Sequence, residues 1–434
     1  MFICLMAGFI VSPFIKQGDV FAQDSDESSS QPPYWIYFGT STADPTPEMK
    51  ELNIPKSEGI YVGKFDPTDG AITDVRLAVP MQSSGFMEAD YNRDILYVVG
   101  KGADANDPAG AYAYKMDRKT GDLTLINSVD GGGPGGCHIA INEDRTFLAI
   151  ANYTDGSFVL FRINGDGSIG EQTAYIKKEG KGVEPRRQDK SYGHAVYFMK
   201  LNGKTRLFMV DLGLDRVYIC QVNEETGELT PDPDIPELVC PPASGPRHLA
   251  WTFDTQGNPV VYVLNELDST LSIFSLKFGD EKGKSFCKHL GTWTTIENKF
   301  REKLTDEVTL VDGVNYTYGN KTAEIVILKK SGKPIVYASN RGQDTLVVFD
   351  AEWFDNPYRR TKPHLDFVQR IPTKGLFPRY FTVDPTGNYM IIANKMSGTI
   401  YVDRIDPKTG ILAPSTHDPI QIAWPIAMAF LPVE

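Results

Sequence analysis

The sequence predicts an all-β fold, because one short pattern recurs along its 434 residues. In each copy an apolar strand ends on a small or polar residue, and a brief turn leads to a second strand and then to a turn rich in Asp and Gly. The clearest copies span 147–163, 207–222, 261–276, 336–351 and 390–405, and two looser copies span 35–65 and 95–116. A repeat of roughly 45–55 residues with about four short strands is typical of a β-propeller blade. Seven such repeats predict a single seven-bladed β-propeller.

The N-terminal residues are predicted to lie outside this fold. Residues 2–15 form an apolar run that is too short for a comfortable membrane span, and small to medium residues follow at 20–22 (VFA), where a signal peptidase would cleave. We therefore expect a signal peptide over 1–22 and an exported protein, periplasmic or secreted. The polar stretch 23–33 ends in proline and is expected to be a disordered linker, which leaves 34–434 for the propeller. No second apolar stretch suggests a membrane span in the mature chain.

Each blade is expected to contribute one inner strand. The expected starts are Phe86, Cys137, His194, Arg247, Ala323, Arg379 and Ile426. The last of these strands, 425–431 (PIAMAFL), stands alone at the C-terminus, whereas the first blade, which begins at Tyr34, lacks an inner strand. We expect the C-terminal strand to complete the first blade, because this closes the ring and leaves no open sheet edge.

Charge and cysteine content limit the partners. The formal net charge of −12 argues against non-specific binding to nucleic acid or to an anionic membrane surface. Of the five cysteines, Cys4 lies in the predicted signal peptide, and the others are widely spaced without a CxxC pair, so zinc ligation is not expected. The sequence leaves open whether these others form disulfides: Cys137, Cys220, Cys240 and Cys287. We expect a monomer whose partner is a small molecule.

Propeller geometry predicts where a site would lie. The strands of a blade alternate in direction, so the start of the inner strand and the turn between the second and third strands open on the same face. Residues in these two columns converge on one mouth of the central channel, which is the first place to expect a pocket. Three of the six histidines fall in the inner-strand column of successive blades: His138, His194 and His248.

Other charged residues occupy the same two columns. Glu266 follows the strand VYVLN, at a turn position where other blades carry Tyr, Leu, Arg or Lys, and it could form an acid–base set with His194 and His248. Three arginines stand at channel-mouth positions of the last three blades and could clamp an anion: Arg247, Arg341 and Arg379. The asparagines that recur in the turn column are expected to have a turn role: Asn152, Asn265, Asn340 and Asn394.

A metal site is the alternative for the histidine column, because three histidines can ligate zinc. The neighbouring arginines would repel a divalent cation, and no Asp, Asn and Glu cage for calcium is evident. The sequence therefore predicts neither a metal nor a cofactor.

Several segments resemble one known family. They are GHAVYF (193–198), GPRHLAW (245–251), VLNELDSTLSIF (263–274), AEIVI (323–327) with YASNRGQDTLVVF (337–349), and PRYFTVDPTGNYMIIAN (378–394). The chain is similar, over nearly its whole mature length, to the seven-bladed lactonases that include propeller-type 6-phosphogluconolactonase and the fungal 3-carboxymuconate lactonising enzyme. The resemblance implies a metal-independent enzyme whose proposed active-site residues match His194, Arg247, Glu266 and Arg341. It places His248, Glu324 and Arg379 at further pocket-lining positions, and we add His138 to these as a substrate contact.

The predicted reaction is hydrolysis of a sugar-type lactone. Glu266, assisted by His194, would deprotonate a water, while Arg247 and Arg341 would stabilise the oxyanion. Two alternatives stay open: cycloisomerisation of a muconate-like acid, and a non-catalytic exported propeller that binds a ligand through its channel face. The stretch 297–320 is longer than the family's usual link and could add a hairpin over or beside the pocket. Export would favour an unphosphorylated lactone or another compound of extracellular sugar or aromatic breakdown.

Overall fold

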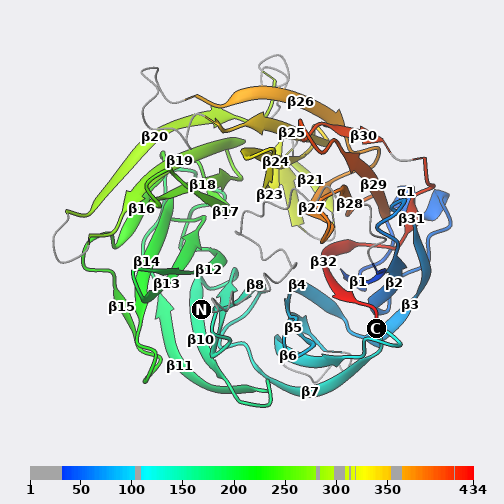
Figure 1. Ribbon diagram of the computed structural model, residues 1–434, viewed down its shortest axis with the longest axis horizontal. Coiled ribbons are helices and arrows are strands. Elements are labelled where there is room, and N and C mark those ends of the chain that lie inside the picture. Colours follow the sequence, from blue (N-terminus) through cyan, green and yellow to red (C-terminus); the bar gives the residue numbers. More distant parts are fainter. Residues whose placement is uncertain are drawn as a thin grey trace, which may run out of the picture.

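The computed structural model describes residues 32–102, 109–279, 284–297, 308–311, 314–317, 319–352, 364–414 and 416–434. Seven antiparallel sheets stand around a central channel, each with four strands in its main path (Figure 1). One short helix, α1 (Pro47–Glu51), accompanies the first blade. The prediction of an all-β, seven-bladed propeller is confirmed. The predicted signal peptide and most of the predicted linker lie outside the described residues and stay predictions.

The chain enters blade one at its second strand, and it enters blades two and three at their inner strands. Blade one contains β1 (Tyr34–Thr40), β2 (Gly59–Phe65) and β3 (Ile72–Pro80). Blade two contains β4 (Ser83–Asp90), β5 (Ile95–Lys101), β6 (Ala109–Met116) and β7 (Leu123–Asp130). Blade three contains β8 (Gly136–Ile141), β9 (Phe147–Asn152), β10 (Ser157–Ile163) and β11 (Ile169–Lys177).

Blades four and five follow in the same order, from the inner strand outward. Blade four contains β12 (Gly193–Leu201), β13 (Lys204–Asp211), β14 (Arg216–Val222) and β15 (Leu229–Pro231), with β16 (Glu237–Val239) also paired to β14. Blade five contains β17 (Pro246–Phe253), β18 (Pro259–Asn265), β19 (Thr270–Lys277) and β20 (Phe286–Thr294). A separate hairpin follows, made of β21 (Val308–Val311) and β22 (Val314–Thr317), so the long link before blade six does form the hairpin that its length predicts.

The last two blades complete the ring. Blade six contains β23 (Lys321–Lys330), β24 (Lys333–Arg341), β25 (Thr345–Asp350) and β26 (Asp366–Pro372). Blade seven contains β27 (Pro378–Val383), β28 (Tyr389–Asn394), β29 (Thr399–Ile405) and β30 (Leu412–Pro414), with β31 (Ile420–Gln421) also paired to β29. The C-terminal strand β32 (Pro425–Pro432) pairs with β1 as the inner strand of blade one. The predicted closure is therefore confirmed.

The hydrophobic core lies between neighbouring blades. In β18, Val261 and Val263 pack toward blade four, while Tyr262 and Leu264 pack toward blade six. All four side chains are fully buried. Because side chains alternate between the two faces of a strand, a strand covered on both faces must be apolar at every position. This burial explains why the inner and second strands appear as continuous hydrophobic runs.

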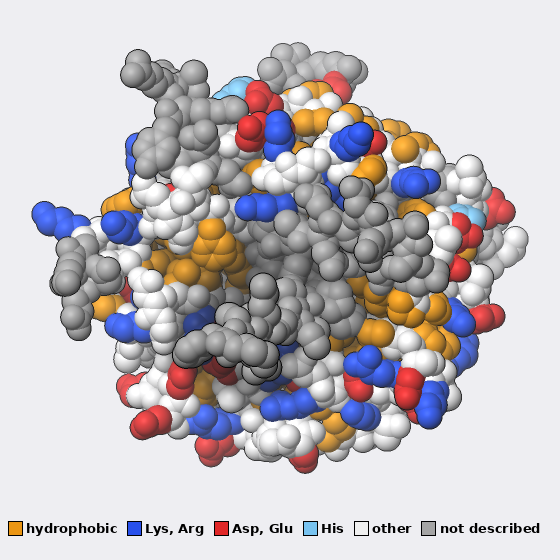
Figure 2. Space-filling model, in the orientation of Figure 1, with side chains coloured by type: hydrophobic (Ala, Val, Ile, Leu, Met, Phe, Trp, Pro, Cys, Tyr) orange, Lys and Arg blue, Asp and Glu red, His pale blue; other side chains and the backbone are white. Residues whose placement is uncertain are grey.

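Three sequence expectations are answered by the described residues. The recurring asparagines of the turn column are fully buried: Asn152, Asn265, Asn340 and Asn394. Each donates a hydrogen bond from Nδ2, either to a hydroxyl at the start of the following strand or to a backbone carbonyl of a neighbouring loop, and so stabilises the turn. The four cysteines outside the predicted signal peptide are unpaired. None of the helices formed by the described residues has the length and apolar character needed to cross a bilayer. Figure 2 shows acidic and basic side chains interspersed over the part of this face that the described residues form, with no large patch of one sign among them.

Candidate active site

A cavity of about 440 Å³ lies at the channel mouth where the inner strands of blades three to seven begin. Its lining comes from the two repeat columns that the sequence predicts and from the loop between β11 and β12, which the sequence does not predict. The described lining residues are Gly135, Cys137, Tyr153, Thr154, Arg187, Tyr192, His194, Glu266, Lys321, Arg341 and Arg379.

A backbone contact joins the two columns in each of these blades. In blade five, the backbone N–H of Glu266 donates to the carbonyl of Gly245, two residues before Arg247, at 2.7 Å. The corresponding contact in blade three runs from Tyr153 to Gly135 at 2.9 Å. The turn after the second strand is thus tied to the start of the inner strand. This is why residues about 20 positions apart meet at one edge of the blade.

Each inner strand of the site carries a β-bulge near its start. The register with the second strand shifts between Gly193 and Ala195, between Pro246 and His248, and between Pro378 and Tyr380. The residues within these shifts are His194, Arg247 and Arg379. A bulge removes one residue from the ladder and re-aims its side chain, and bulges are common beside active sites. The bulges take these three residues out of the ladder, and two of them, His194 and Arg379, line the cavity.

Glu266 is the centre of the charged cluster. Its Oε1 accepts from Arg187 Nη2 at 2.8 Å, and its Oε2 accepts from Arg341 Nη2 at 2.7 Å and from Arg247 Nε at 3.1 Å. The residue is only 4% exposed. Burial alone would raise the pKa of Glu266, but the charges of Arg341, Arg187 and Arg247 hold it well below its ordinary value. Glu266 is therefore a permanent carboxylate and a weak proton acceptor.

His194 lies beside this carboxylate. Its Nε2 is 3.8 Å from Glu266 Oε2, beyond direct hydrogen-bond distance but close enough for one water to contact both atoms. Burial, and after it the charge of Arg247, holds the pKa of His194 well below its ordinary value. The ring is therefore neutral at physiological pH, so one of its nitrogens carries a lone pair that can accept a proton.

Positive charge predominates in the described lining. Arg187, Lys321, Arg341 and Arg379 face a single carboxylate, Glu266. The pKa of Lys321 is lowered to about 8, first by burial and then by the charge of Arg187. Such a cavity favours a ligand that carries negative charge or develops it during reaction.

Four of the predicted site residues form a layer beneath the cavity and do not line it. They are Arg247, His248, Glu324 and His138, each at most 2% exposed. His248 Nδ1 lies 2.9 Å from Glu324 Oε1, and the His138 ring stacks on Phe86 with centroids 4.2 Å apart. The structure thus brings all eight predicted residues to one end of the channel, but in two layers.

Arg187 is the main residue that the sequence pattern missed. It lies in the loop between β11 and β12, outside both repeat columns, and its Nη2 also donates to the Tyr153 hydroxyl at 2.9 Å. The neighbouring Gln188 fixes this loop, because its Nε2 donates to Asp215 Oδ1 at 2.8 Å. A loop residue has no equivalent in other blades, so comparison of the repeats could not find it. Tyr153 stands in the turn column, at the position that Glu266 occupies in blade five, but was not predicted as a site residue, and Lys321 lies just before the inner-strand column.

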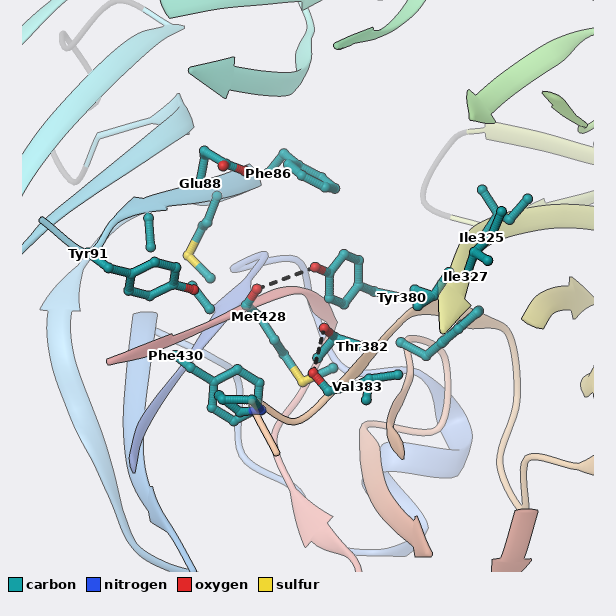
Figure 3. A pocket seen from close by; sticks show the side chains of 16 residues that line it. Phe86, Glu88, Tyr91, Ile325, Ile327, Tyr380, Thr382, Val383, Met428 and Phe430 are labelled. Atoms are coloured by element: carbon teal, nitrogen blue, oxygen red, sulfur yellow. Dashed lines mark hydrogen bonds between the residues drawn. The ribbon is translucent and has the colours of Figure 1, made fainter. Parts of the chain in front are cut away.

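A second, smaller cavity of about 60 Å³ lies farther along the channel (Figure 3). Its described lining comes from the middle and the ends of β4, β23, β27 and β32 and is largely apolar, with Glu88 as the one charged residue. Tyr380 and Met428 approach each other across it, joined by a hydrogen bond from the tyrosine hydroxyl to the Met428 carbonyl at 3.4 Å. Its described lining contains no cationic residue, in contrast to that of the larger cavity, which is therefore the candidate active site.

No group of three His, Cys, Asp or Glu side chains in the described parts of the chain is arranged to hold a metal ion. What the larger cavity offers instead is a carboxylate, a neutral imidazole and several cations. These groups can orient a water, accept its proton and stabilise an oxyanion.

Comparison with known proteins places this site in a family. Residues 35–430 match the family model described as Lactonase, 7-bladed beta-propeller. The chain is 27% identical to the 6-phosphogluconolactonase of Bacillus subtilis over 377 residues, which is 86% of this chain and 95% of that protein. It is 29% identical to the 6-phosphogluconolactonase of Formosa agariphila over 356 residues, 82% of this chain and 90% of that protein. The solved periplasmic gluconolactonase of Pseudomonas aeruginosa shares the fold with a TM-score of 0.73 at 24% identity, over 93% of this chain and all of that one.

Proposed function

The chain belongs to the seven-bladed β-propeller lactonase family, and we propose that it hydrolyses a sugar-type lactone whose ring carries an anionic group. One observation carries this proposal. A buried carboxylate held by three arginines lies beside a neutral histidine in a cavity rich in positive charge. Hydrolysis of a lactone needs a proton acceptor for water and a positive environment for the tetrahedral oxyanion.

In the proposed reaction, one water is bound between His194 Nε2 and Glu266 Oε2. The water loses a proton to the histidine as its oxygen attacks the lactone carbonyl, and Arg341 stabilises the resulting oxyanion. The bond between the carbonyl carbon and the ring oxygen then breaks, and the histidine returns the proton to that oxygen. The product is the open-chain hydroxy acid, and His194 is neutral again.

This assignment divides the roles differently from the sequence-based hypothesis, in which Glu266 is the base. Both oxygens of Glu266 already accept hydrogen bonds from arginines, whose charges hold its pKa well below its ordinary value, so we assign the proton transfer to the neutral His194. Its proposed role is to orient the water and to balance the charge of the arginines. The oxyanion role falls to Arg341, because Arg247 does not line the cavity.

The charge of the lining supports an anionic substrate. The described lining contains four cationic residues and one carboxylate, and two of the relatives named above are 6-phosphogluconolactonases. The predicted signal peptide supports action outside the cytoplasm. There the negative charge on the substrate could come from a carboxylate on the ring in place of a phosphate. We propose that Arg379 and Lys321 contact this anionic group.

A pH-indicator assay of the mature protein, starting at Gln23, tests the proposal. The panel contains glucono-1,5-lactone, its 6-phosphate, further aldonolactones and a muconolactone, each with Glu266→Gln as the control. Proton release that the control loses, with preference for the charged rings, supports the proposal. Ring opening of the muconolactone to the unsaturated acid, which is the reverse of lactonisation, without hydrolysis of any sugar lactone would favour the cycloisomerase. Absence of any turnover would favour a binding protein.

A further inference from the structure

The buried layer beneath the cavity contains a continuous chain of side-chain contacts. It begins at Glu324 in β23, crosses to His248 and Arg247 in β17, and ends at Glu266 after β18. None of the first three residues lines the cavity, and each is at most 2% exposed. A role in direct substrate binding therefore does not suit them.

The distances define this chain of contacts. Glu324 Oε1 lies 2.9 Å from His248 Nδ1, and His248 Nε2 lies 3.1 Å from Arg247 Nη1. Arg247 Nη1 also donates to the carbonyl of Ala323, while its Nε donates to Glu266 Oε2 at 3.1 Å. Both ends of the Arg247 guanidinium are thus fixed.

The chemistry of the partners determines the state of His248. A guanidinium nitrogen can only donate, so His248 Nε2 must accept with its lone pair. Glu324 Oε1 also accepts from the backbone N–H of Ile325 at 3.0 Å, as an unprotonated oxygen does, so His248 Nδ1 must carry the hydrogen. Burial, and after it the charges of Arg247, Arg379 and Arg341, holds the pKa of His248 well below its ordinary value, which keeps the ring neutral.

We infer that Glu324 and His248 are positioning residues, which hold Arg247 and through it fix the Glu266 carboxylate without contacting the substrate. The hydrogen bond from Nε fixes one end of the guanidinium, and Nη1 is held by the Ala323 carbonyl and by His248 Nε2. His248 is the side-chain partner at this second end, and Glu324 supplies the tautomer that makes its contact possible. Only the effect of this arrangement on turnover rests on the proposed function; the tautomer does not.

Two substitutions of the same histidine provide a matched test. In His248→Gln the amide oxygen can reach the position of Nε2 and accept from Arg247, whereas the side chain of His248→Asn is one methylene shorter and cannot. For a positioning role, we expect His248→Asn to lower kcat by about 10- to 100-fold, as removal of an orienting partner does at other sites, with KM unchanged. His248→Gln should retain most of the wild-type kcat. A raised KM with an unchanged kcat in either variant would mean that His248 binds substrate, and full activity in both would also overturn the inference.

A second measurement does not depend on activity. Nitrogen-15 NMR of the full mature protein, labelled in histidine, distinguishes the two neutral tautomers, and His248→Gln identifies the signal by its absence. We expect His248 to be neutral with its hydrogen on Nδ1, both alone and with added gluconate 6-phosphate as a product probe. A hydrogen on Nε2, a doubly protonated ring, or a tautomer that changes with the probe would overturn the inference. If the wild type hydrolyses no lactone, the proposed function fails, and this measurement still decides on the positioning role.

Discussion

Replacing Glu266 by Gln tests the centre of the site, because it removes one negative charge and changes almost no volume. In the wild type the two carboxylate oxygens accept from three arginines at 2.7, 2.8 and 3.1 Å. The amide keeps one oxygen acceptor but turns an NH₂ group toward at least one guanidinium. Two donors would then face each other in a buried position, and no charge would balance the arginines.

The expected cost to folding is large for a single isosteric change. Breaking a buried ion pair by removing one partner typically costs about 3–5 kcal/mol. We expect Glu266→Gln to lower the free energy of unfolding by about this amount, measured by urea denaturation at neutral pH. Glu237→Gln is the matched control, since Glu237 forms a half-exposed pair with Arg216 at 3.6 Å, for which a loss of about 0–1 kcal/mol is expected.

Turnover should fall more steeply than substrate binding. Without the carboxylate the attacking water loses its orientation, and we expect a loss of about 10²-fold in kcat, which is typical when a reacting group is misplaced. KM for an anionic lactone should stay similar or decrease, because the cavity becomes more positive. A variant with wild-type kcat in the proton-release assay would refute the role of Glu266 in the reaction. If Glu266→Gln lowers the free energy of unfolding no more than Glu237→Gln does, the buried ion pairs between Glu266 and the arginines are refuted.

Three further predictions concern the residues around Glu266. Because the pKa of His194 is depressed, its ring stays neutral as the pH falls, so kcat should show no decline near the ordinary histidine pKa of about 6.5; a decline centred there would contradict this state. Arg187→Lys should lower kcat by about tenfold, because an ammonium group cannot hold both Glu266 and Tyr153 in the planar geometry of a guanidinium. An unchanged kcat and an unchanged pH–rate profile would show that Arg187 has no role in the reaction. Lys321 loses its charge as the pH rises through about 8, so KM for an anionic lactone should increase above that pH in the wild type and stay flat in Lys321→Met.

Much of the fold was predictable because the relevant signal is local. Alternating and continuous apolar runs reveal strands, and repeats of similar length reveal blades. Even the ring closure followed from two incomplete pieces, a first blade without an inner strand and a C-terminal strand without partners, which pair as β1 and β32. The repeat columns also identified the face on which His194, Glu266 and Arg341 meet.

The division of that face into two layers was not predictable from the columns. His194 and Arg247 occupy the same kind of bulged position, yet only His194 lines the cavity. Both positions are bulged, so the register does not distinguish them. Arg247 is instead held beneath the cavity by its contacts with His248 Nε2 and with the carbonyl of Ala323 in the next blade, and no single repeat reveals such contacts. This is why Glu324 and His248 are predicted as substrate contacts, while the structure places them beneath the cavity floor.

The sequence by itself determined the number of blades, the closure of the ring and the residue types gathered at one channel mouth, since each depends on a repeated local pattern. The tertiary structure alone decided which of these side chains reach the cavity and that Arg187 joins them from a loop between blades. The physical reason is that these positions depend on contacts between segments far apart in the chain. Gln188 fixes the loop to Asp215, and Arg187 then donates to Glu266, which lies 79 positions away in the sequence.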